Sequence, residues 1–226
     1  MRVLLTGGTG FVGWSMRYTQ PKGISAEYLT RQAYFDAEWR RTKWDAIVHL
    51  APVSPSYVLQ SCDKVLYCSS GAVYEGQTEY AKMKRHYENM CGDSIITRLF
   101  TFSGAHLYRH ALYEFIQDAL KGGPIIVKGD GSAIRSYLYG EDLGRWMWKI
   151  LLEGQGVYDV GSAIHCTVLE AARTVAEVIP CKIKVMNEPG IPNSRYVPDI
   201  TRARELGCVE TIGLKEAIER TISDRR

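Results

Sequence analysis

A glycine-rich turn close to the N-terminus constrains the fold of this chain more than any other feature. A short apolar run, 2–6, leads into three spaced glycines, Gly7, Gly10 and Gly13, and a helical pattern begins at about Phe11. After a buried strand, glycines at this spacing allow a tight turn, close approach of the backbone to a pyrophosphate, and close packing of helix on strand. The helix N-terminus adds N–H donors and the positive end of its dipole. We therefore predict a dinucleotide-binding turn, with a purely structural glycine turn as the alternative.

Strand patterns alternate with helical patterns through the first half of the chain. After the run at 2–6, further apolar runs occur at 24–30, 46–50, 64–68 and 94–99. Strands that alternate with helices form βαβ units, and right-handed crossovers place helices on both faces of a parallel sheet. We predict an α/β protein with a Rossmann fold, a doubly wound parallel sheet covered by helices on both faces.

The pattern loosens beyond residue 102, where a strand is predicted at 125–127 and helices at 112–120, 141–152, 167–179 and 214–222. No repeat, linker or low-complexity segment separates this region from the first half. We predict a single Rossmann-type domain over 1–226, in which roughly 104–140 and 162–226 contribute a small C-terminal substrate-binding lobe.

Composition excludes several classes of function. The net charge is +3 for 226 residues, with scattered Lys and Arg, so neither nucleic acid nor a membrane surface is expected as a partner. The six cysteines form no C-x-x-C pair or Cys/His cluster, so neither a metal site nor a disulfide framework is expected. No run resembles a signal peptide or a membrane span, and we expect a cytoplasmic protein.

The second predicted strand ends at Thr30 and Arg31, without an acidic residue. An acid at this position binds the ribose hydroxyls of NAD, whereas a basic residue accommodates the 2′-phosphate of NADP. We therefore favour NADP slightly over NAD, with Arg31 as the phosphate contact. A solvated surface arginine is the alternative.

Tyr80 and Lys84 are four residues apart on a predicted helix, so their side chains project from one face. Ser70 lies just beyond the strand at 64–68. A phenol is a weak base at neutral pH, but a neighbouring ammonium favours its ionised form. The three residues therefore predict a catalytic set: Tyr80 transfers a proton, Ser70 hydrogen-bonds the reacting oxygen, and Lys84 tunes Tyr80.

These motifs resemble, in order along the chain, those of the extended short-chain dehydrogenase/reductase superfamily, and specifically the NAD-dependent epimerase/dehydratase family. The resemblance covers most of the sequence. The matching segments are 7–13, 49–51, 69–70 with 73–74, 80 with 84, 98–104, 129–131 with 135, 139–142, 158–162 and 195–199.

The resemblance implies an NAD(P)-dependent enzyme that moves hydride at a carbon of a nucleotide-diphosphate sugar, either an epimerase or a 4-keto reductase. Arg135 and Arg195 are then expected to bind the diphosphate, since the guanidinium fork suits phosphate oxygens. The cofactor-binding residues are expected to be Gly7, Gly10, Phe11, Val12, Gly13, Thr30, Arg31, Leu50, Ala51 and Lys84.

The chain also departs from this family, of which it resembles a shortened member. Most of the helix expected between Ala51 and Lys64 is missing, and in the family that helix contributes to a dimer interface. We therefore expect a monomer or an atypical homodimer. Gly71 and Ala72 stand where the family's dehydratases carry an Asp-Glu pair, which argues against dehydration. A non-catalytic dinucleotide-binding sensor or scaffold is the alternative function.

Overall fold

The computed structural model describes residues 1–36, 38–187 and 194–224. The chain divides into two compact units. The first unit comprises Met1–Phe100, Glu141–Val160 and Asp199–Val209, and the second comprises Thr101–Gly140, Gly161–Pro198 and Glu210–Arg226.

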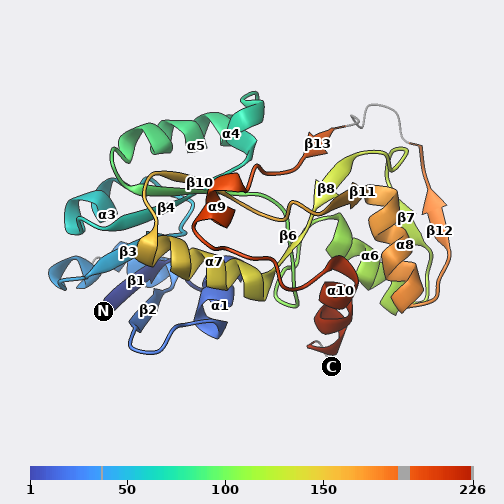
Figure 1. Ribbon diagram of the computed structural model, residues 1–226, viewed down its shortest axis with the longest axis horizontal. Coiled ribbons are helices and arrows are strands. Elements are labelled where there is room, and N and C mark those ends of the chain that lie inside the picture. The colour runs from blue at the N-terminus through green and yellow to red at the C-terminus, as the bar shows by residue number, and fades with distance from the viewer. Residues whose placement is uncertain (37, 188–193, 225–226) are drawn as a thin grey trace. The chain divides into compact units, whose positions relative to one another are not determined.

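A parallel sheet forms the centre of the first unit, with strand order β10-β5-β4-β3-β1-β2 (Figure 1). The strands are β1 (Arg2–Thr6), β2 (Ser25–Leu29), β3 (Ala46–His49), β4 (Val65–Ser70), β5 (Ile95–Leu99) and β10 (Val157–Val160). Strands β3 and β4 are buried along their whole length, as the continuous apolar runs predicted. The strand order reverses at β1, between β3 and β2, which is the arrangement of a Rossmann fold. The predicted fold class is confirmed.

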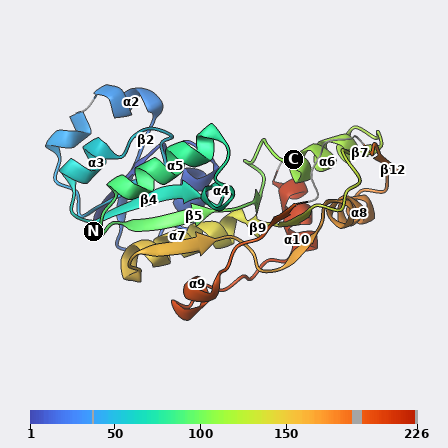
Figure 2. The same cartoon turned by 90° about the horizontal axis from the view of Figure 1, so that it is seen from above.

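Helices cover both faces of this sheet; Figure 2 shows α3 and α5 on one face and α7 on the other. The helical elements are α1 (Phe11–Tyr18), α2 (Arg31–Asp36), a 3-10 turn (Glu38–Arg41), α3 (Ser56–Ser61), α4 (Ala72–Glu75), α5 (Glu79–Met90), α7 (Gly140–Glu153) and α9 (Thr201–Glu205). Helix α5 begins at Thr78, whose side chain accepts a hydrogen bond from the Ala81 N–H and caps the helix. Helix α7 packs closely against α1, and the Trp148 indole donates to the Met16 carbonyl.

One segment that we predicted for the C-terminal lobe belongs to the first unit instead. Residues 199–209 were expected in the C-terminal lobe, but they belong to the first unit. Helix α9 packs on β10, and the Arg202 guanidinium donates to the carbonyls of Val157 and Gln155. Sequence periodicity does not reveal these contacts, because they are made by one side chain to backbone carbonyls far away in the chain.

The second unit consists of small sheets and three longer helices. Its elements are β6 (Phe102–Ser103), α6 (Ala111–Leu120), β7 (Ile125–Val127), β8 (Ile134–Ser136), β9 (Leu138–Tyr139), β11 (His165–Thr167), α8 (Val168–Val178), β12 (Ile183–Val185), β13 (Arg195–Tyr196) and α10 (Leu214–Ser223). The strands pair as β11-β8-β13, β12-β7 and β6-β9. Apolar side chains of α6, α8 and α10, among them Phe115, Val175 and Ile218, form its core. Across the described residues, no helix is both long and apolar enough to cross a membrane.

Candidate active site

The glycine turn joins β1 to α1 and lies against the end of β3. Gly7 has a φ of +70°, and a Cβ there would lie 2.8 Å from the Ala51 nitrogen. Thus Gly7, Leu50 and Ala51, all predicted to bind the cofactor, are neighbours. A Cβ on Gly13 would lie 2.3 Å from the Gly8 carbonyl oxygen, so the first turn of α1 packs directly on the loop.

Gly10 differs from the other two glycines. It is the N-cap residue of α1, and the nearest atom to a Cβ built there is the Gly7 carbonyl oxygen, at 3.6 Å. The space beside Gly10 is therefore open, at the N-terminus of a helix whose first turn contains Phe11 and Val12. The N-terminus of a helix and an open backbone suit a pyrophosphate, so these residues fit the dinucleotide that the sequence predicts.

The end of β2 carries the residues predicted to choose between NAD and NADP. The Thr30 hydroxyl accepts a hydrogen bond from the Ala33 N–H at 3.1 Å, which caps α2. Arg31 is exposed at the first position of α2, and its side chain makes no hydrogen bond or ion pair with another described residue. Its guanidinium is thus accessible to a ligand phosphate.

Ser70, Tyr80 and Lys84 come from β4 and α5, two elements that pack together. Ser70 ends β4, and its hydroxyl accepts a hydrogen bond from the Ala72 N–H at 3.2 Å. Tyr80 is 49% exposed near the start of α5, whereas Lys84, one turn later, is only 5% exposed. The Lys84 ammonium lies 5.9 Å from the centre of the Tyr80 ring. An exposed phenol near a buried ammonium is compatible with the proton transfer predicted for Tyr80.

Burial affects the titration of both Lys84 and the nearby His49. Burial lowers the pKa of Lys84 itself, and it lowers the pKa of His49, on β3, to about 4. His49 Nδ1 lies 2.7 Å from the Thr6 hydroxyl oxygen, and His49 Nε2 lies 3.0 Å from the Val53 carbonyl oxygen. Because a carbonyl only accepts, Nε2 carries the proton and Nδ1 accepts from Thr6. His49 is therefore neutral near pH 7.

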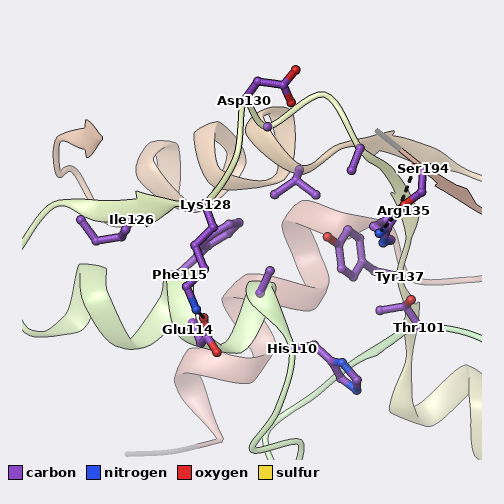
Figure 3. A pocket seen from close by; sticks show the side chains of 14 residues that line it. Thr101, His110, Glu114, Phe115, Ile126, Lys128, Asp130, Arg135, Tyr137 and Ser194 are labelled. Carbon is purple, nitrogen blue, oxygen red and sulfur yellow. Dashed lines mark hydrogen bonds and ion pairs between the residues drawn. The ribbon is translucent and has the colours of Figure 1, made fainter. Parts of the chain in front are cut away.

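A pocket of about 340 Å³ lies within the second unit (Figure 3). Its walls combine apolar, aromatic and charged side chains, as is usual for small-molecule sites. The lining residues are Thr101, His110, Ala111, Glu114, Phe115, Ile126, Lys128, Asp130, Gly131, Ala133, Arg135, Tyr137, Val168 and Ser194.

Arg135 contributes a positive charge to this pocket, which Lys128, Glu114 and Asp130 also line. Its guanidinium donates to the carbonyls of Ile134 and Ser194 and to the Ser194 hydroxyl, at 2.8 to 2.9 Å. All of these acceptors are neutral, and Arg135 forms no ion pair within the described part of the chain. A half-buried guanidinium without a carboxylate partner favours an anionic ligand.

Arg195 does not join Arg135 at this pocket. In the parallel pair β13-β8, Arg195 lies beside Ile134, and Arg135 lies beside Tyr196. Because successive residues of a strand point to opposite faces, the two arginines project from opposite faces of this small sheet. Arg195 is exposed and does not line the pocket.

Sequence reasoning missed Tyr137, which directly follows β8 and lines the same pocket as Arg135. Tyr137 is 6% exposed, and its hydroxyl has no hydrogen-bond partner among the described residues. Figure 3 shows this hydroxyl pointing into the pocket. The every-second-residue spacing of Ala133, Arg135 and Tyr137, all of which line the pocket, is the signal that could have indicated it.

Comparison with known proteins agrees with this architecture. Residues 56–161 match the model of the NAD dependent epimerase/dehydratase family. UDP-glucuronic acid decarboxylase 4 of Arabidopsis thaliana is 31% identical over 140 residues, which is 58% of this chain but only 31% of that protein.

Solved structures share the fold over nearly the whole chain. UDP-glucose 4-epimerase of Thermotoga maritima, solved with UDP-glucose, gives a TM-score of 0.84 at 17% identity and covers 99% of this chain and 98% of its own. UDP-glucuronic acid 4-epimerase of Bacillus cereus, solved with NAD, gives a TM-score of 0.84 at 17% identity. That match covers 100% of this chain and 96% of the Bacillus cereus chain.

The fold and the glycine turn thus define a protein with a Rossmann fold. Over residues 56–161 its sequence is similar to the NAD-dependent epimerase/dehydratase family, which is the family that its motifs resemble.

Proposed function

We propose that the chain is a nicotinamide-dinucleotide-dependent enzyme that acts on a nucleotide-diphosphate sugar, as an epimerase or a 4-keto reductase. The observation that carries this proposal is the set Ser70, Tyr80 and Lys84 on β4 and α5, in the unit that also contains the open glycine turn at Gly10. A protein that only binds a dinucleotide needs the turn but not the proton-transfer set. The sensor or scaffold alternative therefore leaves Tyr80 and Lys84 unexplained.

In the proposed reaction, Tyr80 exchanges a proton with a hydroxyl or carbonyl oxygen of the sugar. Ser70 hydrogen-bonds the same oxygen and stabilises the charge that develops on it. Lys84 favours the ionised form of Tyr80 and contacts the nicotinamide ribose. When bound, the dinucleotide supplies or accepts the hydride. An epimerase returns the hydride to the opposite face of the sugar, whereas a reductase delivers it once.

Two features of this chain support a monomer or an atypical homodimer. Helix α3 has six residues, too few to contribute a long interface helix. The exposed positions of α5 include Glu79, Lys82, His86 and Asn89, which favour contact with water over a helix-to-helix interface.

The proposal is tested by native mass spectrometry of the purified protein, followed by incubation with UDP-glucose and UDP-glucuronic acid. NAD that remains bound through purification supports an epimerase, because its redox-neutral cycle regenerates the cofactor in place. Protein that is empty but takes up NADPH reversibly supports a reductase. If neither dinucleotide binds, the proposed function is wrong.

Arg31 decides the choice between dinucleotides in this proposal. We expect Arg31→Ala to weaken NADPH binding about tenfold or more, because a charge-assisted contact to the 2′-phosphate is lost, a change of about 1.5 kcal/mol. NADH binding should stay within about twofold of its wild-type value. Titration of both cofactors by intrinsic fluorescence measures the change, and an unchanged ratio of the two affinities would remove Arg31 from this role.

Arg135 is proposed to bind the diphosphate of the substrate. We expect Arg135→Ala to weaken UDP-glucose binding by about 2 kcal/mol, roughly 30-fold, in isothermal titration calorimetry. Arg195→Ala is the matched comparison, because Arg195 projects from the opposite face of the sheet. An equal loss supports two arginines on the diphosphate, and a loss in the Arg135 variant alone assigns the contact to Arg135. Full affinity in the Arg135 variant would contradict the assignment.

A further inference from the structure

The ring of Tyr67, on β4, lies directly beside the ammonium of Lys84. The Lys84 Nζ is 4.9 Å from the centre of the Tyr67 ring and donates to the Cys68 carbonyl at 2.7 Å. Tyr67 is fully buried, and Lys84 is 5% exposed. The distance and the burial satisfy the requirements of a cation–π interaction without competing water.

Lys84 has few other partners that stabilise its charge. An ammonium has three N–H donors, and the Cys68 carbonyl is its single hydrogen-bond acceptor among the described residues. The carboxylate of Glu88, one helical turn further on α5, is held by the Arg98 guanidinium at 2.7 Å. The Tyr67 ring therefore supplies part of the negative potential that a carboxylate would otherwise supply.

Four buried titratable groups near Lys84, namely Cys68, Cys91, Tyr67 and His49, are neutral. Burial raises the pKa of the Cys68 thiol to about 11 and that of the Cys91 thiol to about 12. Burial also raises the pKa of the Tyr67 phenol. The His49 ring stacks on Tyr67 at 6.0 Å and stays uncharged, since its pKa is about 4. No second cation competes with Lys84 for the Tyr67 ring among these neighbours.

We propose that Tyr67 is a positioning residue whose ring face holds Lys84 as a cation and directs it towards Tyr80. The ring, rather than the hydroxyl, performs this task, because the buried Tyr67 hydroxyl has no hydrogen-bond partner among the described residues. In this arrangement one N–H of the ammonium donates to the Cys68 carbonyl and a second faces the Tyr67 ring. The third N–H then remains available to a group near Tyr80. The contact itself is independent of the substrate, but its consequence for catalysis rests on the proposed function.

The test measures the pKa of Lys84 directly in the cofactor-free protein. Protein labelled with 13C at the lysine Cε is titrated by NMR, and the Lys84 signal is assigned by its absence from the Lys84→Arg variant. Tyr67→Leu should lower the pKa of Lys84 by about one unit, because the π face is lost. Tyr67→Phe keeps the face and should leave the pKa unchanged within about 0.3 units. Equal values in the Leu and Phe variants would overturn the proposal.

A second series keeps the shape of the ring constant, in case the leucine variant fails to fold. Phenylalanine and its mono-, di- and trifluorinated analogues are placed at position 67 by site-specific incorporation. Fluorine withdraws electrons from the ring face, so the pKa of Lys84 should fall stepwise with each added fluorine. A flat series would overturn the proposal. Because neither cofactor nor substrate is present, either result stands whether or not the proposed enzymatic function is correct.

Discussion

Replacing Gly13 with alanine is expected to destabilise the protein by about 3 kcal/mol and to abolish dinucleotide binding, because the added methyl group would overlap fixed backbone. A Cβ at this position would lie 2.3 Å from the Gly8 oxygen and 2.5 Å from the Gly8 carbonyl carbon. Neither atom can rotate away as a side chain can, so α1 must move off the turn. Urea unfolding followed by circular dichroism measures the loss of stability.

Gly10→Ala is the matched control, since it adds the same methyl group three residues earlier. The nearest atom to that methyl group is 3.6 Å away, an ordinary contact, so stability should change by less than about 0.5 kcal/mol. Dinucleotide affinity should nevertheless fall at least about tenfold, because the methyl group fills the space through which the backbone approaches a pyrophosphate. A Gly10 variant that binds dinucleotide normally would show that this turn is not the pyrophosphate site.

The sequence predicted the first unit well because its signals are local. Continuous apolar runs mark β1, β3 and β4, and the spaced glycines mark the turn that follows β1. The spacing of Tyr80 and Lys84 placed both on one helix, and the structure has both in α5. Periodicity and spacing suffice where an element is long enough for its pattern to be read.

The second unit was less predictable because its strands have only two or three residues. No periodic pattern can be read over that length, so the register that separates Arg135 from Arg195 was not accessible. Nor was the burial of the Tyr137 hydroxyl within the pocket. The contact of Lys84 with Tyr67 was missed for a different reason: it joins a helix to a strand seventeen positions earlier, and only the packing of α5 on the sheet creates it.

Tyr80→Phe is expected to reduce turnover of the nucleotide sugar by about 10² to 10⁴-fold while dinucleotide affinity changes by less than about twofold. The loss corresponds to about 3 to 5 kcal/mol of transition-state stabilisation. The Tyr80 hydroxyl forms no hydrogen bond with another described residue, and the side chain is half exposed, so its removal should not disturb the fold. Turnover is followed by the absorbance of the reduced nicotinamide or by chromatographic separation of the sugar products.

Tyr57→Phe is the control for this prediction, because Tyr57 is 50% exposed, close to the exposure of Tyr80, and lies on α3 outside the proposed catalytic set. That variant should turn over substrate at the wild-type rate. A Tyr80 variant with full turnover would exclude Tyr80 as the proton-transfer group. A Tyr80 variant that loses turnover and dinucleotide binding together would instead point to a role in holding the cofactor, since an acid/base residue affects the chemical step and not the affinity for the cofactor.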